Sequence, residues 1–284
     1  MSDHQVVTAT YPENYFGGIM ICGINYGYSS QDESKENDAT TSQALPLSFF
    51  SDASIDRGRF SPRVQKWLNL WGFELASKPG EETSFEKSFL QTNWLDTQTR
   101  SVTSDGKITV NTLVEESTSF LNLLKQRRPS TIVFAGSLLI EAFNDIRIRD
   151  QIEDIFGERS GKPDIFVASN SSEYKRQFKV LHQRYGSTHL ISLPHPQTRG
   201  LSDEYMSNIK LSDQALSIIT NRHKHREGFG LEDTLFPEAR KKLPHTQEHP
   251  ISWLQRTYQL GYERALRLYS AVLYSQDNVN LMKN

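Results

Sequence analysis

Four short runs of apolar residues, none of which alternates with polar positions, most constrain how this chain can fold. Each run is followed by a loop that is polar or contains glycine. A strand that is apolar on both sides is typical of a parallel sheet with helices covering both faces. The runs are GIMICGI (18–24), SFLQTNW (88–94), TIVFAG (131–136) and THLISLP (188–194), with DIFVA (164–168) as a candidate fifth strand.

Helical patterns lie between these runs. Apolar residues at helical spacing predict helices over 61–76, 111–128 and 137–156. The alternation of strands and helices predicts an α/β fold, a three-layer α/β/α sandwich around a central four-stranded parallel sheet, over residues 10–205. Helical spacing returns from Ile251, so we expect residues 206–284 to form a helical extension that packs on the same domain.

The composition narrows the class of protein. The single cysteine, Cys22, excludes an intramolecular disulfide and a Cys-based zinc or iron–sulfur site. No apolar run approaches the roughly 20 residues that span a bilayer, and the N-terminus lacks a basic-then-apolar signal pattern. We therefore expect a cytoplasmic protein with no membrane contact. We also expect a monomer that needs no metal and no organic cofactor.

The net charge is −2, so binding to nucleic acid would need a local basic surface. The stretch NRHKHRE (221–227) is one candidate. A second stretch gathers five basic or titratable residues, which are Lys175, Arg176, Lys179, His182 and Arg184. Each stretch taken alone is also what a solvated helix or loop presents.

Polar residues with chemical potential stand where the apolar runs end. Asn25 lies between two glycines in GINYG, Asn93 ends the second run, and His195 lies between two prolines. Phe49 and Phe50 are candidate stacking faces. Alone, Asn93 is also a strand-end capping residue, His195 a hydrogen-bonded loop histidine and the phenylalanines core residues. Together they describe a pocket for a planar ring with an amide edge.

In this order, the residues resemble the uracil-DNA glycosylase superfamily. GINYG (23–27) is similar to its first motif, Gly-x-Asn-Pro-Gly, in the mismatch-specific and single-strand-selective branches, and HPQTR (195–199) is similar to its second, His-Pro-Ser-Pro. The segments SFF, FLQTNW and IVFAGS occupy the places of its stacking aromatic, its base-reading strand and its third core strand. The resemblance implies a DNA glycosylase that flips a base out of DNA and leaves an abasic site.

The resemblance also implies roles for particular residues. Asn25 would position the attacking water, Phe50 (or Phe49) would stack on the flipped base, and Asn93 would bind the pyrimidine edge. His195 would stabilise the departing base anion and Arg199 would fill the vacated stack. The remaining expected contacts are Gly23, Ile24, Tyr26 and Gly27 to the flipped nucleotide, and Gln197, Thr198, Lys175 and Arg176 to DNA.

The chain departs from the family pattern at two places. Tyr26 replaces the usual proline of the first motif, and Gln197-Thr198 replace the usual Ser-Pro of the second. Gly27 stands where strict uracil enzymes place a tyrosine that rejects a 5-methyl group. A 5-modified pyrimidine, such as the bulky modified cytosine of some phage DNA, is therefore a candidate substrate. The polar stretch 28–46, which follows this motif, would accommodate the substituent. A catalytically silent base binder and an unrelated small-molecule enzyme are the alternative interpretations.

Overall fold

The computed structural model describes residues 4–27, 60–72, 82–96, 98–99, 108–168, 171–209, 233–243 and 250–281. Its centre is a mixed sheet of six strands in the order β3-β1-β5-β8-β7-β6. Four neighbouring strands are parallel, and these are the four predicted runs. Their bounds are β3 (Phe89–Asn93), β1 (Ile19–Gly23), β5 (Thr131–Ala135) and β8 (Thr188–Leu193).

The prediction of a four-stranded parallel sheet was wrong in extent, because two further strands extend it. β7 (Val180–Tyr185) pairs antiparallel with β8, and β6 (Asp164–Phe166) pairs antiparallel with β7. β7 and β8 form a hairpin that turns at Gly186, which has a positive φ of 50°. β7 carries polar side chains at several positions, so a search for apolar runs passes over it.

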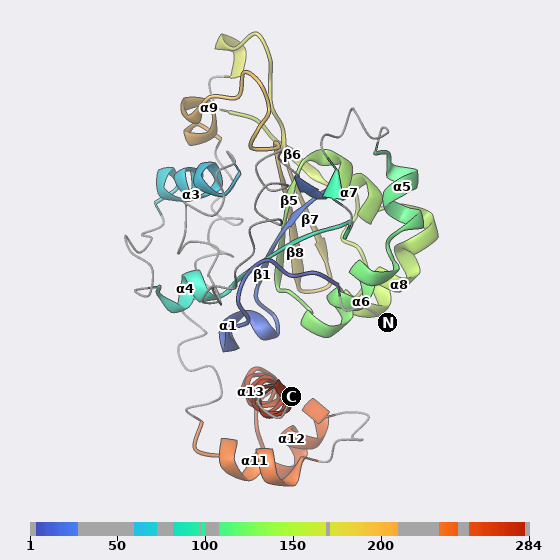
Figure 1. Ribbon diagram of the computed structural model, residues 1–284, viewed down its shortest axis with the longest axis vertical. Coiled ribbons are helices and arrows are strands. Elements are labelled where there is room, and N and C mark those ends of the chain that lie inside the picture. Colours follow the sequence, from blue (N-terminus) through green and yellow to red (C-terminus); the bar gives the residue numbers. More distant parts are fainter. Residues whose placement is uncertain are drawn as a thin grey trace, which may run out of the picture.

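Helices cover both faces of the sheet, so the predicted three-layer α/β arrangement is present (Figure 1). Trp67 and Val64 pack on one face, and Leu113, Phe120 and Phe143 pack on the other. The first layer contains α3 (Ser61–Leu70), α4 (Ser84–Lys87) and α9 (Asp203–Ser207). The second layer contains α5 (Val110–Glu115), α6 (Thr118–Arg127), α7 (Ser137–Phe143) and α8 (Ile146–Phe156).

Two predicted helices are each divided by a polar residue that bonds to the backbone. The expected helix 111–128 breaks at Ser117, whose hydroxyl donates to the Val114 carbonyl oxygen at 2.8 Å. The expected helix 137–156 breaks at Asp145, whose carboxylate accepts the Arg147 N–H and caps α8. Side chains that offer the backbone an alternative partner interrupt helices in this way.

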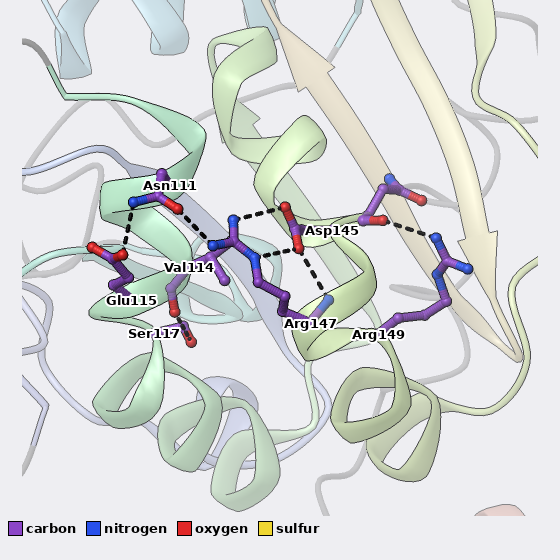
Figure 2. A network of polar contacts seen from close by, with 8 residues as sticks. Asn111, Val114, Glu115, Ser117, Asp145, Arg147 and Arg149 are labelled. Atoms are coloured by element: carbon purple, nitrogen blue, oxygen red, sulfur yellow. Dashed lines mark hydrogen bonds and ion pairs between the residues drawn. The ribbon is translucent and has the colours of Figure 1, made fainter.

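Arg147 also joins the second helical layer across its surface (Figure 2). Its guanidinium donates to both Asp145 oxygens and to Asn111 Oδ1 on α5, at 2.6 Å from the latter. Asn111 in turn donates to Glu115 at 2.7 Å. The hydrogen bonds from Arg147 lower the pKa of the Asp145 carboxyl to about 2. These contacts tie α5 to the start of α8 on the exposed surface of the layer.

The chain ends contribute smaller elements. An N-terminal segment runs antiparallel to β3, with Val6 opposite Thr92, and covers part of the outer edge of that strand. A separate apolar cluster, which includes Leu254 and Leu268, holds α11 (Phe236–Lys242), α12 (Pro250–Tyr258) and α13 (Tyr262–Leu281) together. α13 contacts α1 (Pro12–Tyr15), and the Phe16 and Tyr269 rings lie 6.4 Å apart.

Candidate functional site

The four parallel strands end along one edge of the sheet, in the order Asn93, Gly23, Ala135 and Leu193. After β1 the chain forms β3 on one side of β1 and then crosses over to form β5 on the other side. The carboxyl ends of β1 and β5 therefore flank a topological switch point. Ligands of open α/β sheets bind outside the carboxyl ends of the strands at such a point. The candidate residues Asn25, Asn93 and His195 all lie at this edge or in the loops that leave it.

Gly23 and Asn93 form the most closely fitted pair at this edge. They are register partners on β1 and β3, and a Cβ on Gly23 would lie 2.1 Å from Asn93 Oδ1. Contacts that short do not occur between real atoms, so the Asn93 amide occupies the space that any other residue at 23 would fill. The absence of a side chain at Gly23 therefore allows the observed orientation of the buried Asn93.

The loops that follow β1 and β3 stay paired beyond the sheet. The N–H of Trp94 donates to the Gly23 oxygen and that of Leu95 to the Ile24 oxygen, at 2.9 and 3.0 Å. The strands β2 (Tyr26–Gly27) and β4 (Gln98–Thr99) then pair in parallel. Ile24 packs against the apolar core under α5–α8, and Asn25 is half-buried. The predicted motif 23–27 is thus held from both ends by backbone hydrogen bonds.

His4 supports the end of β3 from the N-terminal segment, and sequence reasoning missed it. Its Nε2 donates to the Asn93 carbonyl oxygen at 2.8 Å. Its Nδ1 lies 3.0 Å from both Asp96 Oδ2 and Ser119 Oγ. The His4 side chain is only 2% exposed, so these contacts fix the backbone that carries the Asn93 amide. No local sequence pattern around His4 predicts contacts with residues so distant in the chain.

His195 lies in a turn that also fixes its ring. The Thr198 N–H donates to the His195 oxygen at 2.8 Å, and the Gln197 N–H donates to His195 Nδ1 at 3.2 Å. Burial lowers the pKa of the imidazole below its ordinary value, so the ring is neutral near pH 7. A neutral ring whose Nδ1 accepts carries its proton on Nε2. His195 therefore presents one N–H donor.

The residues at which 195–199 differs from the pattern His-Pro-Ser-Pro have a structural role in this turn. Gln197 and Thr198 both act through their backbone N–H groups, and the Gln197 side chain is exposed. A proline at 198 has no N–H to donate, so it could not make the bond to the His195 oxygen. The sequence difference at this position is therefore coupled to the hydrogen bonding of the turn.

Asn93 and His195 mark the two ends of the candidate site. The strands that lead to them, β3 and β8, are three strand spacings apart in the sheet, which is about 14 Å. Gly23 and Asn93 lie on the α3 face of the sheet, as does Leu193 at the end of β8. Phe60, directly before α3, has its ring 6.0 Å from that of His195. Sequence reasoning missed Phe60, whose only sequence signal is its place before a helix start.

The antiparallel hairpin brings the basic stretch to the same edge. Because β7 runs opposite to β8, the loop before Val180 lies at the carboxyl end of β8. Tyr205 of α9 holds this loop, since its hydroxyl bonds to both the N–H and the carbonyl of Phe178 at 2.8 Å. Lys175 and Arg176 are exposed there, with the Arg176 guanidinium 5.0 Å from the Phe178 ring centroid.

Other predicted residues fall into three groups. Arg199 is exposed in the loop after His195, close in sequence to the start of α9. His182 and Arg184 belong to β7, where His182 is buried and Arg184 is exposed, so the basic stretch divides between the loop and the strand. Phe49, Phe50 and the stretches 28–46 and 221–227 lie outside the described residues.

The described part of the chain contains no group of three or more His, Cys, Asp or Glu side chains that could hold a metal ion. In the same part, no helix is both long enough and apolar enough to cross a membrane. Cys22 is buried in the core, which raises the pKa of its thiol well above the ordinary value. No family model matches this chain, and no curated protein matches its sequence.

Proposed function

We propose that the protein is a DNA glycosylase that flips a pyrimidine base out of DNA and hydrolyses its N-glycosidic bond. The observation that carries the proposal is the arrangement along the carboxyl edge of the sheet. A buried amide, Asn93, and a neutral N–H donor, His195, lie at the two ends of that edge. Gly23 lies between them and, because it has no side chain, makes room for the Asn93 amide. The resemblance of the 23–27 and 195–199 motifs supports the same function.

Each polar group has a task in this reaction. The Asn93 amide has one acceptor and two donors, which suit the edge of a pyrimidine. Cleavage of the glycosidic bond places negative charge on the departing base, and His195 Nε2–H donates to an oxygen of that base. Asn25 orients the water that attacks C1′ of the sugar. A neutral donor suffices because it stabilises charge that develops only as the bond breaks.

The exposed cations near this edge support a DNA partner over a small-molecule one. Arg199 lies in the loop after His195, and Lys175 with Arg176 lies in the loop that Tyr205 holds against α9. Phosphate contacts of such side chains position a protein on DNA without reading sequence. Arg199 fills the space that the flipped base leaves, while Lys175 and Arg176 bind the phosphates beside it.

The substrate class extends to 5-modified pyrimidines. Gly27 adds no side chain at the position where a tyrosine would reject a 5-methyl group. The role is then base-excision repair or defence against phage DNA that carries modified cytosine. Tyr26, in place of the family's proline, favours the alternative of a base binder without catalysis, because it changes the motif that holds the attacking water.

A panel of oligonucleotides tests the function. Duplex and single-stranded DNA containing uracil, mismatched thymine or 5-modified cytosine are incubated with the protein, and abasic sites are measured by alkaline cleavage. Base release from at least one substrate is expected. Asn25→Ala should lower the rate by roughly 10²-fold and keep DNA affinity, because it removes the group that orients the water.

Asn69→Ala is the matched control, since Asn69 is exposed on α3 and lies outside the proposed site. Its rate should equal that of the wild type. DNA binding by the wild type without release of any base from the panel would replace the glycosylase with the silent base binder.

A further inference from the structure

Arg63, in the first turn of α3, makes contacts on several sides of its guanidinium. Its Nη1 donates to the Pro196 oxygen at 2.5 Å, and its Nη2 donates to the Leu201 oxygen. Its Nε lies 3.7 Å from Asp203 Oδ1, and the guanidinium carbon lies 5.5 Å from the Trp67 ring centroid. The side chain is 21% exposed, so this charge is largely enclosed by its partners.

The two carbonyl groups lie at the two ends of the loop segment that follows His195 and carries Arg199. Pro196 directly follows His195, and Leu201 directly precedes Ser202, the residue that caps α9. Between them, the Gln197 N–H holds the His195 ring through Nδ1. A single side chain from α3 therefore joins both ends of the loop, where the backbone orients the imidazole.

We propose that Arg63 is a positioning residue that holds His195 in the orientation needed to donate to the departing base. The effect on catalysis rests on the proposed glycosylase function, whereas the effect on the His195 ring does not. Arg63 acts through the loop backbone and does not contact the base. The same clamp holds the backbone on both sides of Arg199, the residue proposed to fill the vacated stack.

The geometry of the contacts requires an arginine. A guanidinium is planar and presents its donors in a fixed fork, so two Nη atoms can reach two carbonyls while Nε faces Asp203. A lysine has one ammonium on a flexible stem and cannot hold both ends of the loop in this way. Asp203 anchors the fork, since it also receives Lys66 Nζ at 2.5 Å and Trp67 Nε1 at 3.3 Å.

The test compares Arg63→Gln and Arg63→Lys with Lys66→Gln in the full-length chain. Lys66→Gln removes a contact to the same Asp203 carboxylate but none to the loop carbonyls. Ring nitrogen signals of His195 are recorded by NMR of ¹⁵N-labelled protein, with His195→Gln to assign them. Turnover and DNA affinity are measured on the best substrate of the panel.

In the wild type and in Lys66→Gln, His195 should show the neutral form protonated at Nε2. In both Arg63 variants, the ring signals should move toward an average of the two neutral forms. Turnover should fall by roughly ten- to a hundred-fold with DNA affinity kept, because small displacements of a reacting group carry losses of this size. Arg63→Lys keeps a charge in the same place and serves as the readout if Arg63→Gln does not fold.

Unchanged His195 signals in both Arg63 variants would overturn the proposal. Changed signals together with unchanged turnover would also overturn it, since His195 would then act without the clamp. If the wild type releases no base from any substrate, the proposed function fails, and the NMR comparison alone decides whether Arg63 positions the ring.

Discussion

At the residue scale, the site depends on one glycine, because a neighbouring side chain fills the space that a side chain at this position would need. Gly23 is buried at the end of β1, and Asn93 Oδ1 lies 2.1 Å from the place of its absent Cβ. The need for glycine here comes from packing across strands, because Gly23 has no positive φ. From the sequence, the flanking glycines of the 23–27 motif suggest that the backbone approaches a ligand. They do not indicate that Gly23 packs against Asn93.

Gly23→Ala should displace the Asn93 amide and, on the proposed function, impair recognition of the base. The added methyl group must push on buried neighbours, so the free energy of unfolding should fall by about 1–3 kcal/mol. Urea denaturation and base release measure the two effects. Gly261→Ala is the control, because a Cβ there meets nothing within 4 Å, and its cost as a helix-start residue should stay within about 1 kcal/mol. Equal base release by Gly23→Ala and the wild type would contradict the proposed role of Asn93.

At the element scale, the β7–β8 hairpin brings two buried histidines together. His182 Nε2 lies 3.1 Å from His189 Nδ1, and the rings are parallel within 5°. Burial lowers the pKa of His182, with Arg184 adding to the effect and Asp164 opposing it. The pair lies on β7 and β8, and β8 leads directly into the His195 turn. Protonation of His182 is therefore unfavourable inside the folded sheet.

This burial predicts that acid destabilises the fold. The unfolded chain takes up a proton at His182 near pH 6.5, whereas the folded chain does so only at lower pH. Stability should be full above pH 6.5 and should fall as the pH drops from 6.5 toward the folded pKa. His195 contributes in the same direction, since burial lowers its pKa as well.

Urea unfolding at a series of pH values between 5 and 8 measures this dependence. His182→Gln should make the free energy of unfolding less dependent on pH in the acid range, while the contribution of His195 remains. An unchanged slope in that variant would show that His182 does not titrate differently in the two states.

At the scale of the whole molecule, charge is distributed unevenly around a net value of −2. A chain that is slightly negative overall can bind DNA only where its cations gather. Lys175 and Arg176 lie on the loop at the carboxyl edge of the parallel strands, next to the proposed site. Lys125 is also exposed, but it lies in the last turn of α6, which leads into the amino end of β5.

Removing Lys175 and Arg176 together should weaken binding to any DNA sequence. Each neutralised phosphate contributes about 0.9 to the slope of log affinity against log salt, so the double alanine variant should lower that slope by about two. Titrations at several salt concentrations measure it. Lys125→Ala should leave both the affinity and the slope unchanged. A double variant with the salt slope of the wild type would place the DNA interface elsewhere.

Most of the parallel core is readable from the chain, because a strand buried on both faces must be apolar at nearly every position. The four apolar runs therefore correspond to β1, β3, β5 and β8. β7 has polar residues along its length, so it does not form an apolar run. Its place in the sheet depends on the turn at Gly186 and on pairing with β8 on one side and β6 on the other. Helix breaks at Ser117 and Asp145 depend on single hydrogen bonds, which periodicity does not register.

For the site, residue types at strand ends are visible in the sequence, whereas the contacts that orient them are not. Asn93 and His195 stand out because each follows an apolar run. His4 and Arg63 do not stand out, because their partners are far away in the sequence. His4 and Asn93 are 89 positions apart, and Arg63 and Leu201 are 138 positions apart. Local patterns carry information over one helical turn or one strand pair, and contacts of this range arise only when the layers pack.

The apolar runs and the polar residues after them specify an α/β core with a candidate site at its carboxyl edge, because burial dictates composition locally. The antiparallel hairpin, the fit of Asn93 over Gly23 and the Arg63 clamp on the His195 loop are decided by tertiary structure. The physical reason is common to all three. Each depends on the distance and direction between groups that belong to different layers or strands, and the sequence records the groups but not their separation in space.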